Sequence, residues 1–298
     1  MGEGKDRKMK KTDLRGILFL VFAAMIWGFA LVAQKAGTEN LGPLTFTGLR
    51  CMLGSLSMIP LIIILDGKKT PEQKEAEHNP AILLKGGMLC GLVVFSFTIL
   101  QQIGIQYTTV GKSGFITALY IILVPLAGLF LKRKVEKRIW FAAGFYLMCM
   151  SEGLTAINRG DILMLMASVG CAVHIYAIDY FVNKVDPVKF SSLQFLITGI
   201  ISLVLALFLE DIRWQNIFAT AVPILYAGII SCGLGYTFQI LGQKYVEPAK
   251  ASLLLSSETI FTMLAGMLFF QEMLSIKEYI GCGFIFFAII LSQIQRKS

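Results

Sequence analysis

Apolar runs of about 20 residues recur along the whole sequence and are separated only by short polar breaks. A helix of that length crosses a hydrocarbon core of about 30 Å and pairs its own backbone polar groups. Hydrophobic residues make up 56% of the chain and charged residues 15%, which indicates a bilayer environment. We therefore predict an all-α membrane protein with ten transmembrane helices. The expected helices are residues 16–34, 44–65, 82–106, 113–131, 139–153, 162–182, 188–209, 217–243, 251–270 and 279–294.

An internal repeat constrains how these helices are arranged. Residues 101–128 read QQIGIQYTTVGKSGFITALYIILVPLAG, and residues 239–266 read QILGQKYVEPAKASLLLSSETIFTMLAG. Aligned without a gap, the two copies share eight of 28 positions, among them Gln101 and Gln239. Self-similarity of this kind indicates that one structural unit occurs twice. We expect a basic tail at residues 1–15, a first repeat at 16–154 and a second repeat at 160–294.

The distribution of positive charge predicts the orientation. Of the 27 Lys and Arg residues, 21 fall in breaks on the side of the N-terminus and 6 on the other side. The positive-inside rule then places both termini in the cytoplasm, with the chain in the plasma membrane. The net charge of +8 is accordingly an insertion signal, and we expect no nucleic-acid partner. Five helices in each half give the halves opposite topology, so the repeat is predicted to be inverted.

The sequence offers little for metal, redox or nucleotide chemistry. Six cysteines lie inside apolar runs without a C-x-x-C pair, and the chain has two histidines. Neither a metal site nor a disulfide is implied, and no cofactor is expected. The sequence contains no Walker motif, so any energy input would have to come from an ion or substrate gradient.

Four segments in this order resemble the EamA family of the drug/metabolite transporter superfamily. They are AAMIWGFALVAQK at 23–35, FTGLR at 46–50, GIQYTTVGKSGFITALYIILVP at 104–125 and SSETIFTMLAGMLFFQE at 256–272. The resemblance implies two five-helix repeats and transport of an amino acid, a sugar, a nucleotide derivative or another metabolite. Glu272 stands where the family usually places a Glu after the ninth helix, whereas Lys134 occupies the matching place in the first half.

Glu258 is the best single candidate for a functional residue. It lies eight residues into the predicted ninth helix, about 12 Å along the helix axis and near the middle of the bilayer. An ionisable group at that depth is expensive and asks for an explanation. As a functional residue, Glu258 would bind a substrate amine or take up a coupling proton. The alternative is a carboxylate that a neighbouring Ser or Tyr satisfies and that only fixes helix packing.

Other polar and aromatic residues inside the runs are weaker candidates. Arg50 lies about 10 Å from the outer end of the second helix and could attract a substrate carboxylate, or it could snorkel or pair locally. His174 would be a packing residue, a gating residue or a proton relay. Trp27, Tyr120 and Tyr236 would suit an amphipathic substrate.

Gln101, Gln239 and Pro125 are candidates for gates and a hinge. Each glutamine lies about 9 Å from a different face of the membrane, so the pair could form an outer and an inner gate. Each could equally hydrogen-bond a neighbouring helix. Pro125 in mid-span would bend the fourth helix near the cavity, either as a fixed kink or as a hinge.

These observations favour a secondary transporter that works by alternating access around a central cavity. The substrate would be a small polar or amphipathic metabolite such as an amino acid, with export favoured by family analogy and protons as the candidate coupling ion. A receptor or scaffold that transports nothing is the first alternative. An intramembrane enzyme is the second, but two histidines and scattered cysteines do not supply a nucleophile with its base or a metal site.

Overall fold

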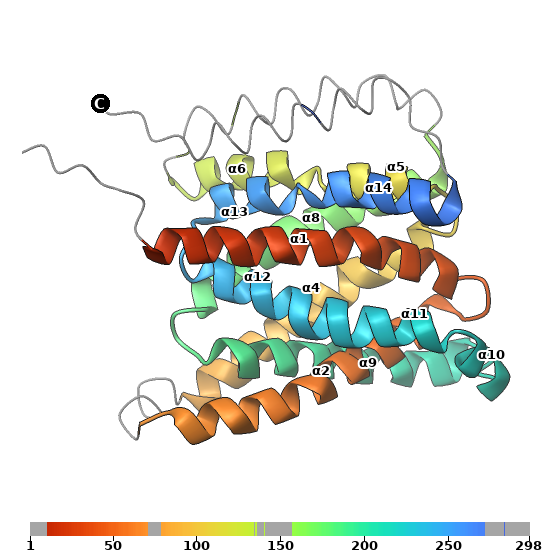
Figure 1. The fold of residues 1–298 in the computed structure, drawn as a ribbon, viewed down its shortest axis with the longest axis horizontal. Coiled ribbons are helices and arrows are strands. Elements are labelled where there is room, and N and C mark those ends of the chain that lie inside the picture. Colours follow the sequence, from red (N-terminus) through yellow and green to blue (C-terminus); the bar gives the residue numbers. More distant parts are fainter. Residues whose placement is uncertain are drawn as a thin grey trace, which may run out of the picture.

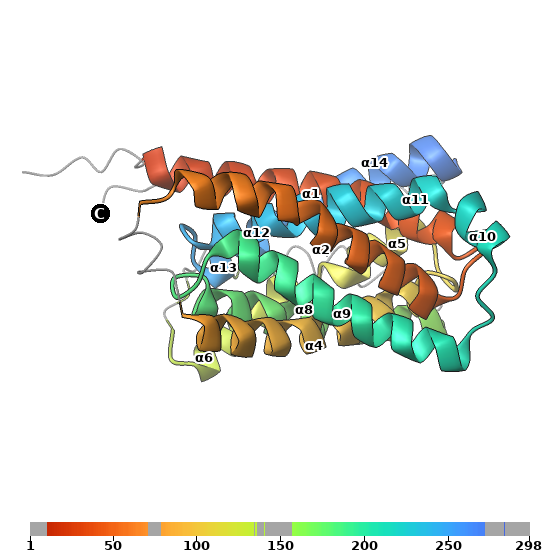
Figure 2. The same ribbon diagram turned by 90° about the horizontal axis from the view of Figure 1, so that it is seen from below.

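A computed structural model describes residues 11–70, 79–133 and 157–271, together with the single residues 135, 140 and 283. All regular elements in these ranges are helical, and eight segments are long and apolar enough to cross a membrane. The segments lie side by side in one bundle (Figure 1), and the view from below shows that they form more than one layer (Figure 2). The predicted fifth and tenth helices, and with them Lys134 and Glu272, fall outside the described residues, apart from residues 140 and 283.

Five of the eight spans are single continuous helices. They are α1 (Lys11–Gly37), α2 (Pro43–Lys68), α4 (Pro80–Gly104), α8 (Arg159–Phe181) and α9 (Pro187–Leu209). Because α1 begins at Lys11, the last residues of the expected N-terminal tail are helical. Proline stands at the first position of α2, α4 and α9, where its missing N–H leaves no hydrogen bond unmade and its fixed φ favours the helix.

The other three spans are interrupted. One combines α5 (Val110–Thr117) with α6 (Tyr120–Phe130), and another combines α13 (Pro248–Leu255) with α14 (Glu258–Phe270). The third combines α11 (Ala221–Leu225), a π-helix η1 (Tyr226–Gly235) and α12 (Tyr236–Gln243), and the short helix α10 (Trp214–Ala219) precedes it. The sequence predicted an uninterrupted helix at each of these places.

The interruptions of α5–α6 and α13–α14 are equivalent in the repeat. The first falls at Ala118 and Leu119, the second at Ser256 and Ser257, and the two are 138 residues apart. Both turns use the same tightened hydrogen bonds: the N–H of residue 119 donates to the carbonyl of 116 at 3.1 Å, and that of 257 to 254 at 3.2 Å. The sequence repeat is therefore a structural repeat down to its irregularities.

Two glycine contacts show that equivalent parts of the halves lie at opposite ends of the bundle. A Cβ on Gly160 would lie 2.6 Å from the carbonyl oxygen of Gly104, where α4 ends against the start of α8. A Cβ on Gly242 would lie 3.0 Å from the carbonyl oxygen of Gly16, where α12 ends against the start of α1. We call the end at which α1 begins the near end and the other the far end. Equivalent helices α1 and α8 thus start at the near and the far end, respectively.

Acidic residues tie α2 to α9 at both ends. At the far end the Glu210 carboxylate accepts hydrogen bonds from the backbone N–H groups of Leu44 and Thr45, both at 2.8 Å, and caps the start of α2. At the near end Asp66 pairs with Lys189 at 2.6 Å, close to the start of α9. Asp66 and Glu210 are 144 residues apart, as are Thr45 and Lys189, so these are equivalent contacts with different chemistry.

Large apolar side chains cover much of the outer surface of the bundle. Phe130, Phe208 and Val222 are 87%, 80% and 77% exposed, respectively. Exposed apolar area on this scale would be unusual in water and is typical of a surface that faces lipid.

Candidate functional site

A cavity lies in the interior of the bundle, between the two halves of the chain. It has an empty volume of about 560 Å³, part of it open to solvent. Helices α1, α2, α4, α5 and α6 of the first half and α8, η1, α12, α13 and α14 of the second half contribute to its walls. Its polar lining residues are Gln34, Arg50, Gln101, Thr117, Tyr120, His174, Ser231, Tyr236, Gln239 and Glu258. The polar groups converge on this space from both halves, as they do in binding sites for small molecules.

The structure brings together nearly all of the residues that the sequence singled out. The six substrate candidates and the two glutamines line this one cavity, although they come from seven different elements. They are Trp27, Arg50, Gln101, Tyr120, His174, Tyr236, Gln239 and Glu258. Pro125 does not line the cavity; it is buried within α6, which continues as a regular helix on both sides of it.

Arg50 places a positive charge in the cavity wall. It is 3% exposed, and its guanidinium carbon lies 5.8 Å from the centre of the Phe46 ring one turn earlier in α2. The Nε and Nη2 atoms have no hydrogen-bond partner among the described residues. The side chain therefore neither snorkels to the membrane surface nor pairs with a local carboxylate, the two alternatives that its sequence position left open.

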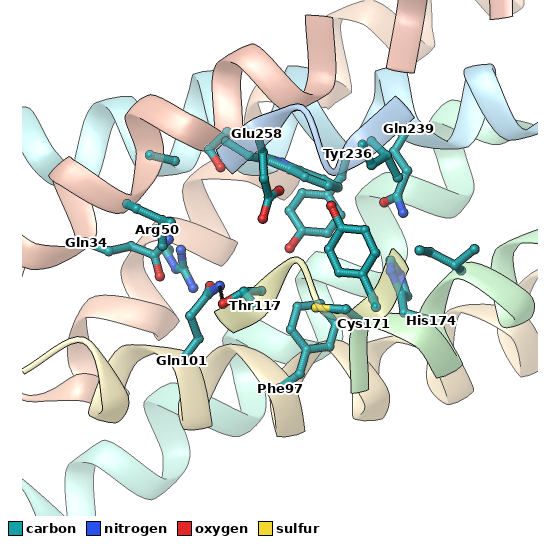
Figure 3. A pocket seen from close by; sticks show the side chains of 17 residues that line it. Gln34, Arg50, Phe97, Gln101, Thr117, Cys171, His174, Tyr236, Gln239 and Glu258 are labelled. Carbon is teal, nitrogen blue, oxygen red and sulfur yellow. Dashed lines mark hydrogen bonds between the residues drawn. The ribbon is translucent and has the colours of Figure 1, made fainter. Parts of the chain in front are cut away.

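Among the residues that the structure describes, Glu258 is the only carboxylate that lines the cavity. It is 5% exposed and is the first residue of α14, directly after the break at Ser257. Figure 3 shows its carboxyl directed into the cavity, with the Arg50 guanidinium reaching in from another wall. The hydroxyl of Tyr120 lies close enough to the carboxyl to interact with it.

Aromatic rings form a continuous wall beside these charges. The ring centre of Trp27 lies 4.5 Å from that of Tyr236, and His174 lies 5.9 Å from Tyr236 and 5.6 Å from Phe97. The Nε2 atom of His174 also hydrogen-bonds Oε1 of Gln194 on α9 at 3.0 Å. His174 is therefore held between rings and a hydrogen bond, a geometry that fixes its orientation in the cavity wall.

Gln101 and Gln239 lie in the same cavity and do not mark two separate sites. The Gln101 amide donates to the Thr117 hydroxyl at 3.5 Å. Gln239 is 2% exposed, and its Oε1 atom has no hydrogen-bond partner within the described ranges. The equivalent glutamines thus bracket one space from opposite halves, which is the arrangement that an inverted repeat produces at its centre.

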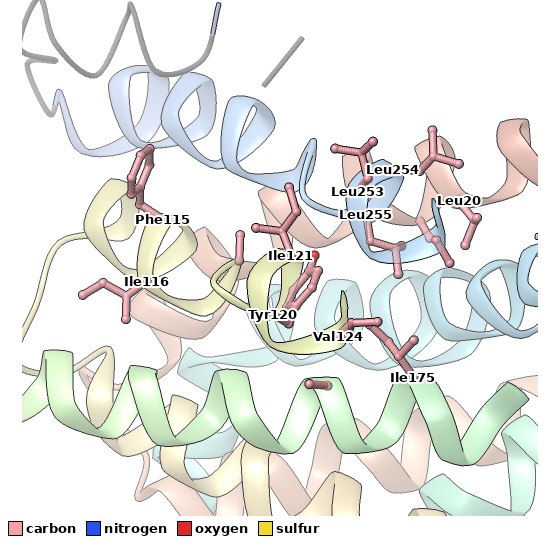
Figure 4. Packing of buried hydrophobic residues seen from close by; sticks show 14 of the residues in the cluster. Leu20, Phe115, Ile116, Tyr120, Ile121, Val124, Ile175, Leu253, Leu254 and Leu255 are labelled. Carbon is pink, nitrogen blue, oxygen red and sulfur yellow. The ribbon is translucent and has the colours of Figure 1, made fainter. Parts of the chain in front are cut away.

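The break before Tyr120 is held in place by the largest apolar cluster of the bundle. Tyr120 is 2% exposed, and its neighbours Ile121 and Val124 pack against α8 and α13 (Figure 4). The cluster includes Leu20, Phe115, Ile116, Ile175, Leu253, Leu254 and Leu255. Because these side chains come from both halves, the cluster fixes the two breaks relative to each other and to the cavity.

Gln34, Thr117, Cys171 and Ser231 also line the cavity and were missed by the sequence reasoning. Gln34 carried the same signal as Gln101, a glutamine inside an apolar run. Ser231 could not be predicted, because it enters through the π-helix η1, whose wider turns shift the register of the helix.

Two glycines allow η1 to pack closely against α1 and α2 beside the cavity. A Cβ on Gly233 would lie 2.7 Å from the Ser57 hydroxyl, and a Cβ on Gly235 would lie 2.9 Å from Nε1 of Trp27. The close approach of this span to α1 and α2 therefore depends on the absence of a side chain at these two glycines.

A polar cluster of three residues lies at the far end of the bundle. Lys112 pairs with Asp161 at 2.6 Å, and the Thr108 hydroxyl donates to the other oxygen of Asp161 at 2.9 Å. Asp161 also takes part in the capping box with which Asn158 starts α8. The equivalent near-end positions hold Lys250, Ile17 and Val246, in the same order. Where the far end has a buried carboxylate, the near end therefore has two apolar residues, Val246 in the large cluster and Ile17 packed against that cluster.

Comparison with known proteins adds a family and a fold. A sequence model described as the EamA-like transporter family matches residues 14–150 and 158–293, one match in each half. The chain is 25% identical over 280 residues to an uncharacterized transporter of Archaeoglobus fulgidus, covering 92% of this chain and 84% of that one. It is 22% identical to the uncharacterized transporter YoaV of Bacillus subtilis, covering 93% and 96%, respectively. One solved crystal structure matches with a TM-score of 0.74, covering 93% of this chain and 95% of the other at 14% identity, which is a likeness of fold.

Proposed function

The chain belongs to the EamA-like transporter family, and on that premise we propose that it is a secondary transporter of a small polar or amphipathic metabolite, such as an amino acid. Transport would proceed by alternating access, with export as the direction that the family resemblance favours. The protein would lie in the plasma membrane with both termini in the cytoplasm, in keeping with the 21 to 6 distribution of Lys and Arg.

The cavity is the single observation that carries this proposal. It lies where the two halves meet, and buried charges of both signs, Arg50 and Glu258, face into it. Ionisable residues inside a membrane bundle are expensive and mark substrate or ion pathways. A bundle stabilised only by packing would need neither charge, because each could be replaced by an apolar side chain of similar size.

The contacts at the two ends suggest how access would alternate. Opening the far end would separate Gly104 from Gly160 and break the ion pair of Lys112 with Asp161. Opening the near end would separate the equivalent elements, α12 and the start of α1. In this scheme Gln101, in the hairpin of α4 and α5, and Gln239, in the equivalent hairpin of α12 and α13, would act as gates. Pro125 would act as a hinge within α6. The half-helix breaks would give both hairpins a point at which to bend.

Counterflow in proteoliposomes tests the proposal. Vesicles that contain the purified protein are loaded with one unlabelled compound from a panel of amino acids, sugars and amines and exposed to its radiolabelled form at two pH values. We expect transient accumulation of at least one compound, and its loss in Glu258→Gln. The matched control Asp211→Asn removes a carboxylate that is 72% exposed and pairs with the nearby Arg213, and should transport normally. A correctly folded protein without flux across the panel would favour the receptor or scaffold alternative.

A further inference from the structure

The positive charge of Arg50 is not balanced by the protein. The guanidinium has five N–H donors and no acceptor, and it is buried with Nε and Nη2 unpaired within the described ranges. A buried charge without a partner is strongly unfavourable, so the site requires an anion or water in the cavity. The planar fork of donors fits a carboxylate, which it can bind through two parallel hydrogen bonds.

The negative charge of Glu258 is in a comparable position. No ion pair joins its carboxylate to any Lys, Arg or His in the described part of the chain, and its polar neighbour is the neutral phenol of Tyr120. Arg50 and Glu258 face the same space and do not pair with each other. The cavity therefore holds a guanidinium and a carboxyl group that are separate from each other.

We infer that the cavity recognises a zwitterion, whose carboxylate binds Arg50 and whose ammonium group binds Glu258. This inference rests on the proposed function and names its substrate class. A ligand with one charge would neutralise one residue and leave the other buried without a partner. A zwitterion satisfies both residues, and it carries no net charge into a cavity whose own two charges cancel.

The remaining lining residues match this orientation. Gln34 and Gln101 lie on the same side as Arg50, where their amides can hydrogen-bond a carboxylate (Figure 3). The ring of Tyr236 lies on the side of Glu258, and the Trp27 ring packs beside it with the ring centres 4.5 Å apart, so that both aromatic faces can attract an ammonium group. Each pole of the ligand thus meets one charged residue and a second group of suited chemistry.

The side chain of the zwitterion would be apolar. Leu31, Phe97, Ile175 and Leu255 line the cavity alongside the polar groups, and Phe97 is 2% exposed. A polar side chain on the ligand would leave its own hydrogen bonds unmade against these residues. An amino acid with an aliphatic or aromatic side chain is the simplest compound that meets all three conditions.

Binding of matched compounds to the purified full-length protein tests this assignment. The reference probe is L-leucine. Two analogues, L-leucinamide and isoamylamine, lack the carboxylate charge, and a third, 4-methylpentanoate, lacks the amine. The corresponding phenylalanine series is tested in the same way. We expect the amino acid of at least one series to bind roughly tenfold or more tightly than its three analogues, as measured by titration calorimetry. An analogue that binds as tightly as the amino acid, or no binding in either series, would overturn the inference.

Variants assign the two poles. Arg50→Gln should abolish the preference for the amino acid over its amide, and Glu258→Gln the preference over the deaminated acid. Arg213→Gln and Asp211→Asn are the matched controls, because this exposed pair lies outside the cavity and should leave both preferences intact. If Arg50→Gln does not fold, Arg50→Lys keeps the charge but loses the fork, and it should weaken the preference. If neither Arg50 variant folds, the binding of the amino acid and its three analogues to the wild-type protein still tests whether the cavity recognises a zwitterion.

The outcome is separable from that of the counterflow experiment. Selective binding of the zwitterion without flux would contradict the transport function and leave the ligand assignment intact. Flux of a sugar or a simple amine, without preference for the zwitterion, would support transport and contradict the assignment.

Discussion

Tyr120 and Glu258 occupy equivalent positions in the two halves, each as the first residue of the helix that follows a break, and their side chains meet in the central cavity. The inverted repeat turns the two breaks toward each other, so residues 138 positions apart become neighbours. One half contributes a neutral phenol and the other a carboxylate. The repeat therefore supplies a symmetric frame, and the difference at its centre gives the cavity its polarity.

Replacing Glu258 with Gln should lower the affinity for substrate by roughly tenfold or more, because one charge-assisted contact is lost. It should also change the pH dependence. If the ionised carboxylate binds the substrate ammonium, protonation at low pH removes that contact, so wild-type affinity falls as the pH is lowered, and the Gln variant has a flatter profile. The other titratable groups of the cavity are Arg50, Tyr120, Cys171, His174 and Tyr236. An unchanged pH profile in the variant would assign the dependence to one of these groups.

Replacing Asp161 with Asn should favour conformations that are open at the far end. The change removes a 2.6 Å ion pair whose carboxylate is 2% exposed. In a Gln34→Cys background, a membrane-impermeant thiol reagent added on that side should react roughly tenfold faster, the equivalent of about 1.4 kcal/mol. Asp211→Asn is the control because its pair with Arg213 is exposed. Equal reaction rates in the two variants would mean that the buried pair does not hold this end closed.

Replacing Gly28 with Ala should destabilise the protein by about 1–3 kcal/mol, because the added methyl cannot be accommodated. Its Cβ would lie 2.8 Å from the backbone of Phe261 and Thr262, where α1 crosses α14. Gly67→Ala is the matched control, since a Cβ there meets nothing within 4 Å. Thermal unfolding in detergent should show a lower midpoint for the first variant only. Similar midpoints would show that α1 and α14 can separate without loss of stability.

Replacing Glu210 with Ala should cost about 1–2 kcal/mol, since it removes a charged cap from the start of α2. The carboxylate accepts two backbone hydrogen bonds and a third, at 2.6 Å, from the Thr45 hydroxyl. Glu39→Ala, at an exposed position, should unfold like the wild type. Hydrogen exchange would locate the effect, with faster exchange at the N-H groups of Leu44 and Thr45 than in the control.

The sequence predicted the eight described spans, because each needs only a long apolar run, and it predicted most of the cavity. The apolar runs contain few polar residues, and this made Glu258, Arg50 and the two glutamines recognisable as candidates. Contacts such as Glu210 with Thr45 could not be foreseen, because they join residues far apart in the chain. The π-helix was equally hidden, since the equivalent residues of α4 in the other half form a regular α-helix.

The position of the break in α5–α6 shows a further limit. Pro125 suggested a bend, yet the break precedes it by six residues, at Leu119. Proline is not the cause, because α13–α14 breaks at the equivalent place and has Met263 where the first half has Pro125. The half-helices on both sides of each break pack against the shared apolar cluster, and that packing is a property of the whole bundle.

Protection of Cys171 tests the central claim, that the cavity is the substrate site, most directly. Cys171 lines the cavity and is partly exposed, whereas Cys51, Cys90 and Cys232 are buried and serve as internal references. The unmodified protein is treated with N-ethylmaleimide in the presence of a compound that undergoes counterflow, and labelling of each cysteine is followed by peptide mass spectrometry. The account predicts that only Cys171 is labelled more slowly. This protection should increase with the concentration of the compound over the same range in which transport saturates. Unchanged labelling at concentrations that saturate transport would contradict it.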